Sequence, residues 1–541
     1  MIVDQKLIVT KDTPMRAFHR HWQFCVGSPH ATYALRRDWF EQLKRLHEEL
    51  GVERVRFHGI LSDDMHTYHQ EEDLTIGLPG PGITEESFRW CGVAYDNVLA
   101  AGMKPFVELS FMPGHLAARD EKGMFFYKPN ITPPSDYKAW GNFIRDFIRY
   151  LIDRYGSEEV ETWYFEVWNE PDLPVIFFNG TQEEYFKLYE VTVRAIKDVD
   201  SKIIVGGPST SGSKWLREFI ACCEENRIPL DFVSTHQYSN DEALGGIPGE
   251  TKNAVSHNDT GDSLPFNFGK MLKKRLETLP EDIRKDSLVP YYRYMMGTAH
   301  SESQMKLGNL INSARFARVR AKDYPLYYTE WNLCSAFAGP ANDTRKVAAY
   351  DVHTILNTQD TIDGSSIWCF TDLFEELHPF AEEFHGGFGM QTQSGIRKPV
   401  YRALQFLKEA GNERYDIPSN PESVNGDPDI AVFVRNGMPQ ILLGLPDLSG
   451  AEDICRTIEL TVPVEETPKK AILRRIDENH VNPKKVWEEM GSPKTPNLRQ
   501  VREIEEVSAA EREEIPFTCD EGMLTVTAEL HSNDLWFITF E

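Results

Sequence analysis

The stretch WYFEVWNEPD (163–172) reads as one buried β-strand that carries acids where apolar side chains are expected. Side chains alternate between two faces along a strand, so Glu166, Trp168 and Glu170 share one face. Glu166 lies in mid-strand, and we expect it to be an internal hydrogen-bonded group. Glu170 stands at the end, where Pro171 stops the strand. An acid at the end of an apolar strand points to chemistry at that end.

Similar apolar runs recur about eight times over roughly 400 residues, separated by amphipathic helical patterns. The other predicted strands are FCVGSPH (24–30), RVRFHGILSDD (54–64), KPFVELSFMP (104–113), KIIVGGPST (202–210), DFVSTHQY (231–238), PLYYTEWN (325–332) and SSIWCFTD (365–372). Strand followed by helix, repeated in this way, predicts an α/β fold of the (β/α)8 TIM barrel type. A doubly wound sheet is the alternative, but no GxGxxG opens a helix after the first strand.

The pattern changes near residue 415, where short apolar runs are separated by Pro, Gly, Asn and Asp. This predicts an all-β sandwich over 415–541 behind a catalytic barrel over 16–414. We expect residues 1–15 to form a strand associated with the sandwich. Residues 239–324 are longer than one barrel helix requires and predict an insertion at the site mouth or at an oligomer contact.

Composition restricts the partners of the chain. Lys and Arg number 58 and Asp and Glu 84, so the formal charge is −26. Such a charge disfavours nucleic acid and anionic membranes. The charged N-terminal segment does not resemble a signal peptide, and the eight Cys show no CxxC. We therefore expect a cytoplasmic protein, or a secreted or periplasmic one if a signal peptide has been removed.

Functional groups of a barrel belong at the C-terminal ends of its strands. Those positions hold a polar and aromatic ring: His58, Asp63, Asp64, His115, Asn169, Glu170, His236, Tyr238, Glu330 and Trp368. Glu170 and Glu330 stand out, because each ends an otherwise apolar strand. Cleavage of a glycosidic bond needs such a pair, one carboxyl to protonate the leaving oxygen and one to attack or to activate water. The alternative is that each is a salt-bridged structural acid.

Six motifs in this order resemble glycoside hydrolase family 39, the β-xylosidases and their relatives. They are RFHGILSDD (56–64), FEVWNEPD (165–172), STHQY (234–238), YYTEWN (327–332), WCFTDLFEE (368–376) and FHGGFG (384–389). The resemblance implies that Glu170 is the general acid/base and Glu330 the nucleophile of a retaining double displacement. Their carboxyl groups should then lie roughly 5–5.5 Å apart.

The resemblance also implies a sugar-binding shell. Asn169 is expected to bind the 2-hydroxyl, Tyr238 to orient Glu330, and Arg56 to keep Glu330 ionised. Arg56 paired with a structural acid is the alternative. Trp368 is expected to form the aromatic platform, and Glu375, Glu376, His58 and His236 to bind hydroxyls, with Phe125 as a wall.

The sequence therefore predicts an exo-acting β-xylosidase that acts on small xylo-oligosaccharides without a cofactor. HTYH (66–69) lacks a third metal ligand in the pattern, so no metal is expected. An α-L-arabinosidase, a β-glucosidase or an α-L-iduronidase-like enzyme remains open, although a uronate would need basic residues that the shell lacks. A non-catalytic carbohydrate-binding barrel is the alternative from a different class. A homo-oligomer is also an open prediction.

Overall fold

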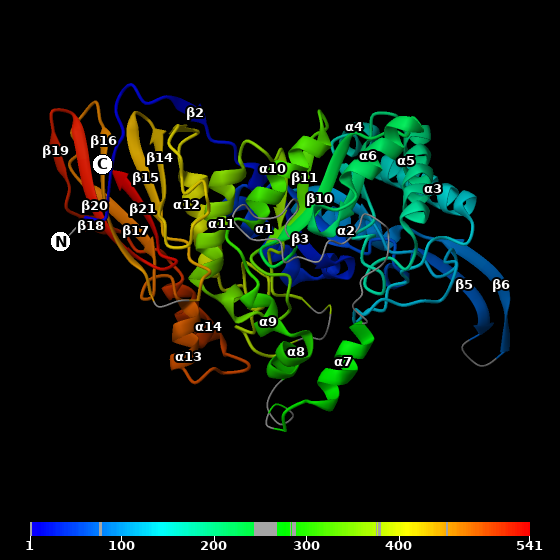
Figure 1. The fold of residues 1–541 in the computed structure, drawn as a ribbon. Helices are drawn as coiled ribbons and strands as arrows, with labels where there is room; N and C mark the ends of the chain where they lie inside the picture. The colour runs from blue at the N-terminus through cyan, green and yellow to red at the C-terminus, as the bar shows by residue number, and fades with distance from the viewer. Residues whose placement is uncertain are drawn as a thin grey trace.

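The computed structural model describes residues 3–74, 78–242, 268–281, 283, 288–374, 376, 380–450 and 453–541. A barrel surrounded by helices occupies the centre, and a stack of two sheets lies at the end where both termini are found (Figure 1). Among the described residues, no helix has both the length and the apolar character needed to cross a bilayer.

The barrel prediction is confirmed: eight parallel strands close in the order β10-β11-β12-β3-β4-β7-β8-β9. The strands are β3 (Cys25–His30), β4 (Arg54–His58), β7 (Lys104–Leu109), β8 (Tyr164–Val167), β9 (Ile204–Thr210), β10 (Phe232–Tyr238), β11 (Leu326–Asn332) and β12 (Gly364–Ile367). Helices cover the outer face and side chains fill the interior, so nearly every strand residue is buried. This explains why the runs are almost continuously apolar.

One principal helix follows each barrel strand: α1 (Arg37–Leu50), α2 (Arg89–Ala100), α3 (Tyr137–Tyr155), α5 (Gln182–Val199), α6 (Leu216–Glu225), α10 (Asn309–Ala321), α11 (Arg345–Thr358) and α12 (Pro399–Glu409). A short helix, α4 (Ser157–Val160), follows α3. Capping residues in the sequence determine where several of these helices begin. The side chain of Asp136 accepts hydrogen bonds from the first turn of α3, and Thr181 with Glu184 forms a capping box on α5.

An aromatic layer closes the N-terminal end of the barrel interior. Phe24 stacks on Tyr327 with ring centroids 4.6 Å apart and meets Tyr164 edge to face. Phe106 and Phe232 complete the layer. Since these rings fill the floor, the charged side chains higher in the barrel face only one opening, at the C-terminal ends of the strands.

The C-terminal region consists of two sheets with an apolar core between them. One sheet has the order β1-β16-β20-β19: β1 (Gln5–Ile8), β16 (Cys455–Pro463), β20 (Met523–His531) and β19 (Thr518–Asp520). The other has the order β18-β17-β21-β15-β14-β13-β2: β18 (Glu513–Ile515), β17 (Ala471–Ile476), β21 (Leu535–Phe540), β15 (Met438–Gly444), β14 (Asp429–Arg435), β13 (Glu413–Tyr415) and β2 (Met15–Ala17). The N-terminal strand β1 runs parallel to β16. Strands β2 and β13 pair with each other across both expected barrel boundaries.

Helix α11 lies between the barrel and the sheets, which explains why it is buried on almost every side. The ring of His353 on this helix lies 2.9 Å, through Nδ1, from a carboxylate oxygen of Asp429 on β14, and its Nε2 lies 3.0 Å from Ser423 Oγ. Two short helices, α13 (Pro483–Glu489) and α14 (Leu498–Val507), extend below the sheets.

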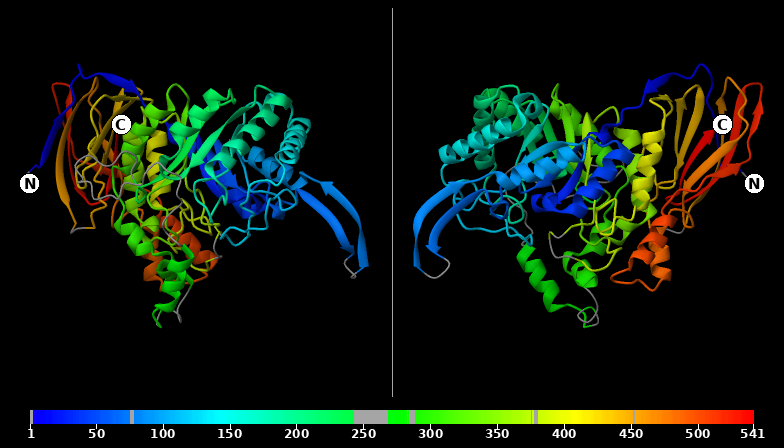
Figure 2. Two further views of the ribbon diagram at one scale, coloured as in Figure 1. Left: turned by 45° about the vertical axis from the view of Figure 1, so that its right-hand side comes forward. Right: turned by 180° about the vertical axis from the view of Figure 1, so that it is seen from behind.

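Two features lie outside the basic barrel. The long connection before β11 holds α7 (Phe268–Glu277), α8 (Leu288–Met296) and α9 (Thr298–Ser303) ahead of the barrel helix α10. The sequence analysis missed the second feature, a hairpin of β5 (Tyr68–Leu74) and β6 (Leu78–Glu86) that projects from the body (Figure 2). Its sequence, rich in Gly, Pro and acids, lacks the alternation that marks a strand.

Candidate active site

Glu170 stands just beyond β8, where the chain turns sharply. Trp168 and Glu170 have φ of +74° and +41°, a left-handed conformation that side-chain-bearing residues rarely adopt. The backbone N–H of Glu170 donates to Ser209 O at 2.9 Å, and the indole N–H of Trp168 donates to Phe177 O at 3.0 Å. These bonds hold a strained turn that aims the Glu170 side chain into the barrel mouth.

Glu330 lies within β11, the last carboxyl before the strand ends at Asn332. Its Oε1 accepts a hydrogen bond of 2.7 Å from the hydroxyl of Tyr238. Its Oε2 lies 3.5 Å from Nη1 of Arg56 and has no hydrogen-bond partner in the described part of the chain. One oxygen is therefore fixed and the other is left available for reaction.

The two carboxyl groups are close together. One oxygen of Glu170, one oxygen of Glu330 and one nitrogen of His236 all lie within 4.8 Å of one another. Nδ1 of His236 is 2.9 Å from Glu170 Oε1 and 3.9 Å from Glu330 Oε2. Three such groups could also hold a metal ion, but Arg56 already places positive charge beside Glu330. A spacing this short matches a direct attack better than one with an intervening water.

The guanidinium of Arg56, on β4, joins five strands below the carboxyl pair. Its nitrogens lie 2.7 Å from Glu166, 2.9 Å from Glu108 and 2.7 Å from the side-chain oxygen of Asn169. It also donates to Ser209 Oγ at 3.2 Å. Arg56, Glu108 and Glu166 have no exposed side-chain surface. Arg56 therefore contacts both of its predicted partners, the structural acids and Glu330. Its distances to Glu108 and Glu166 are shorter than its distance to Glu330.

The surroundings give the two carboxyl groups different tendencies to ionise. Burial, reinforced by the charge of Asp172, raises the pKa of Glu170 to about 8. Burial and the charge of Glu170 also raise the pKa of Glu330, and the positive charges of His58 and Arg56 oppose this rise. Because Glu330 has a guanidinium and a phenol as neighbours, we assign it the ionised state and Glu170 the protonated state near neutral pH.

His58 supplies a second positive charge. Burial alone would lower the pKa of His58, but the charge of Glu108 and its 2.6 Å contact with Nδ1 outweigh this and raise the pKa to about 9. By contrast, burial lowers the pKa of His236 to about 4, so this ring is neutral. Burial raises the pKa of Glu376, 3.9 Å from His58, to about 8.

A cavity of about 370 Å³ opens above the carboxyl pair. Seven of the predicted site residues line it: His58, Phe125, Glu170, Tyr238, Glu330, Trp368 and Glu376. Asn169 and Arg56 are fully buried behind them, with Nδ2 of Asn169 lacking a partner among the described residues. Glu375 lies outside the described residues.

His236, which was expected to bind a hydroxyl, lies deeper than the other predicted residues of the shell. Its ring is fully buried between the two carboxyl groups and does not line the cavity. Sequence shows that a residue stands near a strand end, but not the depth at which its side chain packs. In this position His236 can hold Glu170 in place rather than reach a hydroxyl.

Comparison with known proteins gives this arrangement its context. The sequence profile of glycosyl hydrolases family 39 matches residues 5–259 and 291–525. The chain belongs to glycosyl hydrolases family 39. A β-xylosidase of Caldicellulosiruptor saccharolyticus is 37% identical over 513 residues, 94% of this chain and 93% of that protein. A β-xylosidase of Geobacillus stearothermophilus is 30% identical over 99% of this chain and 95% of that protein.

The fold agrees with this assignment. The structure of a family 39 β-xylosidase from Caulobacter crescentus superposes with a TM-score of 0.73, at 26% identity over 99% of each chain. An α-L-iduronidase of Mus musculus matches at 26% identity over 66% of this chain and 57% of that protein. The protein is thus a glycoside hydrolase, as the sequence analysis predicted.

Three residues of the predicted ring, His115, Asp63 and Asp64, make contacts outside the cavity. His115 stacks on Tyr68 of the projecting hairpin, with ring centroids 3.4 Å apart. Asp63 accepts a hydrogen bond from Gly114 N at 2.8 Å, and Asp64 lies 2.6 Å from His30 Nε2. The chain runs on past β4 and β7 toward the hairpin before it turns back, which carries these residues away from the cavity.

The sequence analysis also missed Glu108, which binds both Arg56 and His58. Its signal was available, because Glu108 is an acid inside the apolar strand β7, as Glu166 is in β8. A buried acid on the inner face of a barrel strand needs a cationic partner, and Arg56 was already a candidate.

A buried ion cluster forms around Lys398, next to the HGGFG turn. Nζ of Lys398 lies 2.6 Å from both Asp343 and Asp372 and donates to Gly387 O at 2.9 Å. All three charged side chains have no exposed surface. Trp368 packs with Tyr238, Phe374 and Phe388 in an apolar cluster.

The cluster explains the HGGFG motif, which could have indicated a phosphate site. Asp343 accepts from Gly386 N at 2.6 Å and Asp372 from Gly389 N at 2.7 Å. A Cβ added to Gly387 would lie 2.3 Å from Asp372 Oδ1, so only glycine fits. The motif brings its backbone against the two aspartates and needs no anion.

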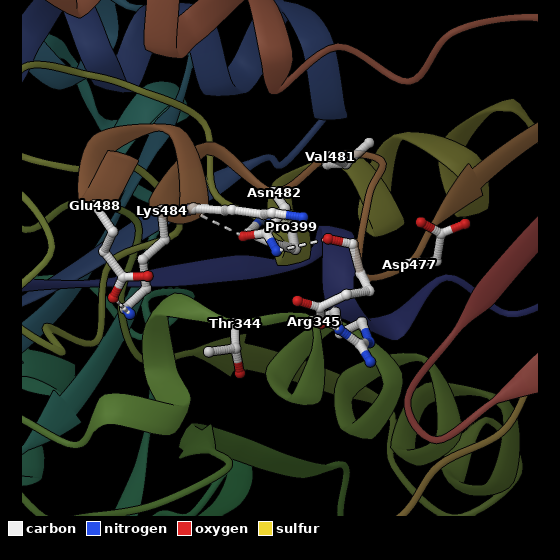
Figure 3. Close-up of a pocket in the computed structure, with 10 residues that line it drawn as sticks. Thr344, Arg345, Pro399, Asp477, Val481, Asn482, Lys484 and Glu488 are labelled. Carbon is white, nitrogen blue, oxygen red and sulfur yellow. Dashed lines mark hydrogen bonds and ion pairs between the residues drawn. The ribbon is translucent and has the colours of Figure 1, made fainter. Parts of the chain in front are cut away.

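A second cavity, of about 240 Å³, lies where the barrel meets the C-terminal region (Figure 3). It is lined by Thr344, Arg345, Pro399, Asp477, Glu478, Val481, Asn482, Lys484, Lys485 and Glu488. Arg345 pairs with Glu478 and Lys484 with Glu488, so much of its charge is internally balanced. It shares no lining residue with the first cavity.

The protonation of Glu170 predicts the pH dependence of the enzyme. A general acid must carry its proton, and the protonated fraction of Glu170 falls as pH rises through about 8. With a poor leaving group, kcat/KM should therefore fall above this pH. Asp172→Asn removes a charge that raises the pKa of Glu170, so the basic limb should move to lower pH. A basic limb that stays in place in Asp172→Asn would contradict the assignment.

Loss of the Lys398 charge should destabilise the protein. Lys398→Met leaves Asp343 and Asp372 buried without a cation, a change that costs about 3–5 kcal/mol for a buried pair. We expect thermal unfolding at a lower temperature than in Lys408→Met, which changes an exposed lysine in α12, the helix whose N-cap residue is Lys398. Equal melting temperatures for the two variants would show that the cluster does not stabilise the fold.

Proposed function

We propose that the protein is a retaining, exo-acting β-xylosidase that releases xylose from the non-reducing ends of xylo-oligosaccharides. The proposal is carried by two carboxyl groups, Glu170 and Glu330, with oxygens no more than 4.8 Å apart, in a chain 37% identical to a β-xylosidase. It requires no cofactor, since the two acids carry every proton and bond change.

In the first step, Oε2 of Glu330 attacks the anomeric carbon while the bond to the leaving oxygen breaks. Glu170 gives its proton to that oxygen, and the sugar is left as an ester on Glu330. Glu170, now ionised, then takes a proton from water, whose oxygen attacks the same carbon and frees Glu330. Two inversions give net retention. The free Oε2 and the raised pKa of Glu170 support these roles.

Exo action is supported by the way the cavity is enclosed. Every barrel strand except β3 contributes lining residues, in the strand or in the loop that follows it. Met296 at the end of α8 and Ser301 in α9 also line the cavity, so the insertion adds a further wall. Walls all around favour one terminal sugar over the middle of a polymer chain. The insertion thus helps to shape the site mouth.

A neutral sugar fits the charges better than a uronate. In the described lining, Lys214 carries the only ammonium group, and it lies 3.3 Å from Asp172. The charge of His58 is balanced by Glu108, whose Oε2 lies 2.6 Å from His58 Nδ1. Asp172, Asp241 and Glu170 all act on the charge of Lys214, so a carboxylate beside it would meet acids. Among the described lining residues, no cation is therefore clear of acids to bind a uronate carboxylate, although an α-L-iduronidase is among the relatives. Two intact, paired acids also disfavour a purely carbohydrate-binding role.

A panel of aryl glycosides tests the proposal: β-xyloside, α-L-arabinoside, β-glucoside and α-L-iduronide. We expect the highest kcat/KM for the β-xyloside, and proton NMR of the first-formed product should show the β-anomer. A preference for the iduronide would overturn the substrate assignment. An initial α-anomer would overturn the retaining mechanism but not the sugar.

A further inference from the structure

The loop after β9 lies beside Glu170 on the rim of the barrel. In the closed strand order, β12 lies opposite β8, and β9 is the neighbour of β8. Trp368, after β12, therefore faces Glu170 across the mouth. If the sugar whose glycosidic bond is cleaved lies between them, the leaving oxygen lies against Glu170. The leaving group then extends over the loops after β8 and β9. Ser211, Gly212 and Lys214 line the cavity there.

This loop is both strained and firmly held. Ser213 and Trp215 in the loop, and Ser209 at the end of β9, have φ of +56° to +57°, and Gly212 has φ of +56°. The carboxylate of Asp172 accepts from Ser211 N at 2.8 Å and from Ser211 Oγ at 2.7 Å. Left-handed residues cost free energy, and a cluster of them persists where the surroundings impose it, often at a functional site. Here the cluster brackets Lys214.

The ammonium of Lys214 has capacity to bind a ligand. Nζ lies 3.3 Å from Asp172 Oδ2 and 3.5 Å from Ser211 Oγ, and 43% of the side chain is exposed. An ammonium group has three hydrogens to donate, and it lines the cavity that opens above the two acids. Burial would lower the pKa of Lys214, but the charge of Asp172 outweighs this and raises it.

The neighbours of Lys214 select the class of ligand. The side chain of Asp172 is 2% exposed, and Asp241, after β10, lines the same cavity as Lys214. The acids Asp172, Asp241 and Glu170 all interact with the charge of Lys214. An anionic leaving group would meet these carboxyl groups, whereas a sugar offers hydroxyls that can accept from Lys214 and donate to Asp241.

We propose that Lys214, positioned by Asp172 and accompanied by Asp241, forms the subsite that binds the hydroxyls of the leaving sugar. The inference rests on the proposed exo-glycosidase function and adds what that function leaves open, which is how the enzyme recognises the sugar on the far side of the bond. Lys214 is then a specificity-determining residue for oligosaccharides over simple glycosides.

Three substrates separate this role from an indirect one. Xylobiose has a sugar as leaving group. An alkyl β-xyloside also has a poor leaving group that needs protonation, but without further hydroxyls, and an aryl β-xyloside needs little protonation. In Lys214→Met we expect kcat/KM for xylobiose to fall about tenfold to a hundredfold, the scale of a lost charge-assisted hydrogen bond. The alkyl and aryl substrates should fall about threefold at most.

Controls make the result specific. Lys187→Met removes an exposed lysine of α5 with its own acidic partner and should leave the ratio of xylobiose to alkyl xyloside as in the wild type. Lys214→Arg keeps the charge and should restore part of the xylobiose activity. Each rate is measured at the pH optimum of that variant, because Lys214 also lowers the pKa of Glu170.

Equal losses on xylobiose and on the alkyl xyloside would overturn the inference, since Lys214 would then act only through the proton of Glu170. Unchanged rates on all three substrates would overturn it as well. Neither result would contradict the proposed function. That function is contradicted by a different result, namely that the wild-type enzyme hydrolyses no β-xyloside.

Discussion

The buried guanidinium of Arg56 is the interaction on which the site depends. It binds Glu108, Glu166, Asn169 and Ser209 and approaches Glu330, so one side chain of β4 fixes groups from β7, β8, β9 and β11. A charge without exposed surface is tolerable only when it is paired. Nε and Nη2 of Arg56 are hydrogen-bonded, and Nη1 lies 3.5 Å from the Glu330 carboxylate. The geometry of the network is therefore closely determined. Relaxing it would leave buried charge unpaired.

This constraint explains how two neighbouring carboxyl groups can take opposite roles. Glu330 faces the cations Arg56 and His58 and receives the hydroxyl of Tyr238, all of which favour a carboxylate. Glu170 faces a neutral His236 and, more remotely, the negative Asp172. Both groups are buried, so burial alone would not distinguish them. The distinction arises from the neighbours that the barrel strands place beside each one.

The sequence was sufficient to predict the barrel and to bring Glu170 and Glu330 to one cavity. Eight buried strands give eight apolar runs, and Glu170 and Glu330 interrupt those runs at the end where a barrel carries its site. Charged residues that meet only in three dimensions were beyond this reasoning. Lys398 reads as an ordinary surface lysine, and nothing in the spacing shows that Asp343 and Asp372 enclose it. Lys214 was missed for the same reason.

Depth was the other quantity that the sequence did not report. His58 and His236 both stand at strand ends, yet the first lines the cavity and the second is enclosed between the carboxyl groups. The polar hairpin of β5 and β6 likewise forms strands without the alternation that normally predicts them. Its cross-strand backbone pairing is what the structure adds.

The central claim is that Glu330 attacks the sugar while Glu170 carries the proton. Covalent trapping tests it most directly. A 2-deoxy-2-fluoro-β-xyloside with an activated leaving group should slow the second step and leave the sugar on the enzyme. Peptide mass spectrometry should then locate one fluoroxylosyl group on Glu330. A label on Glu170, or no label on either acid, would contradict the account.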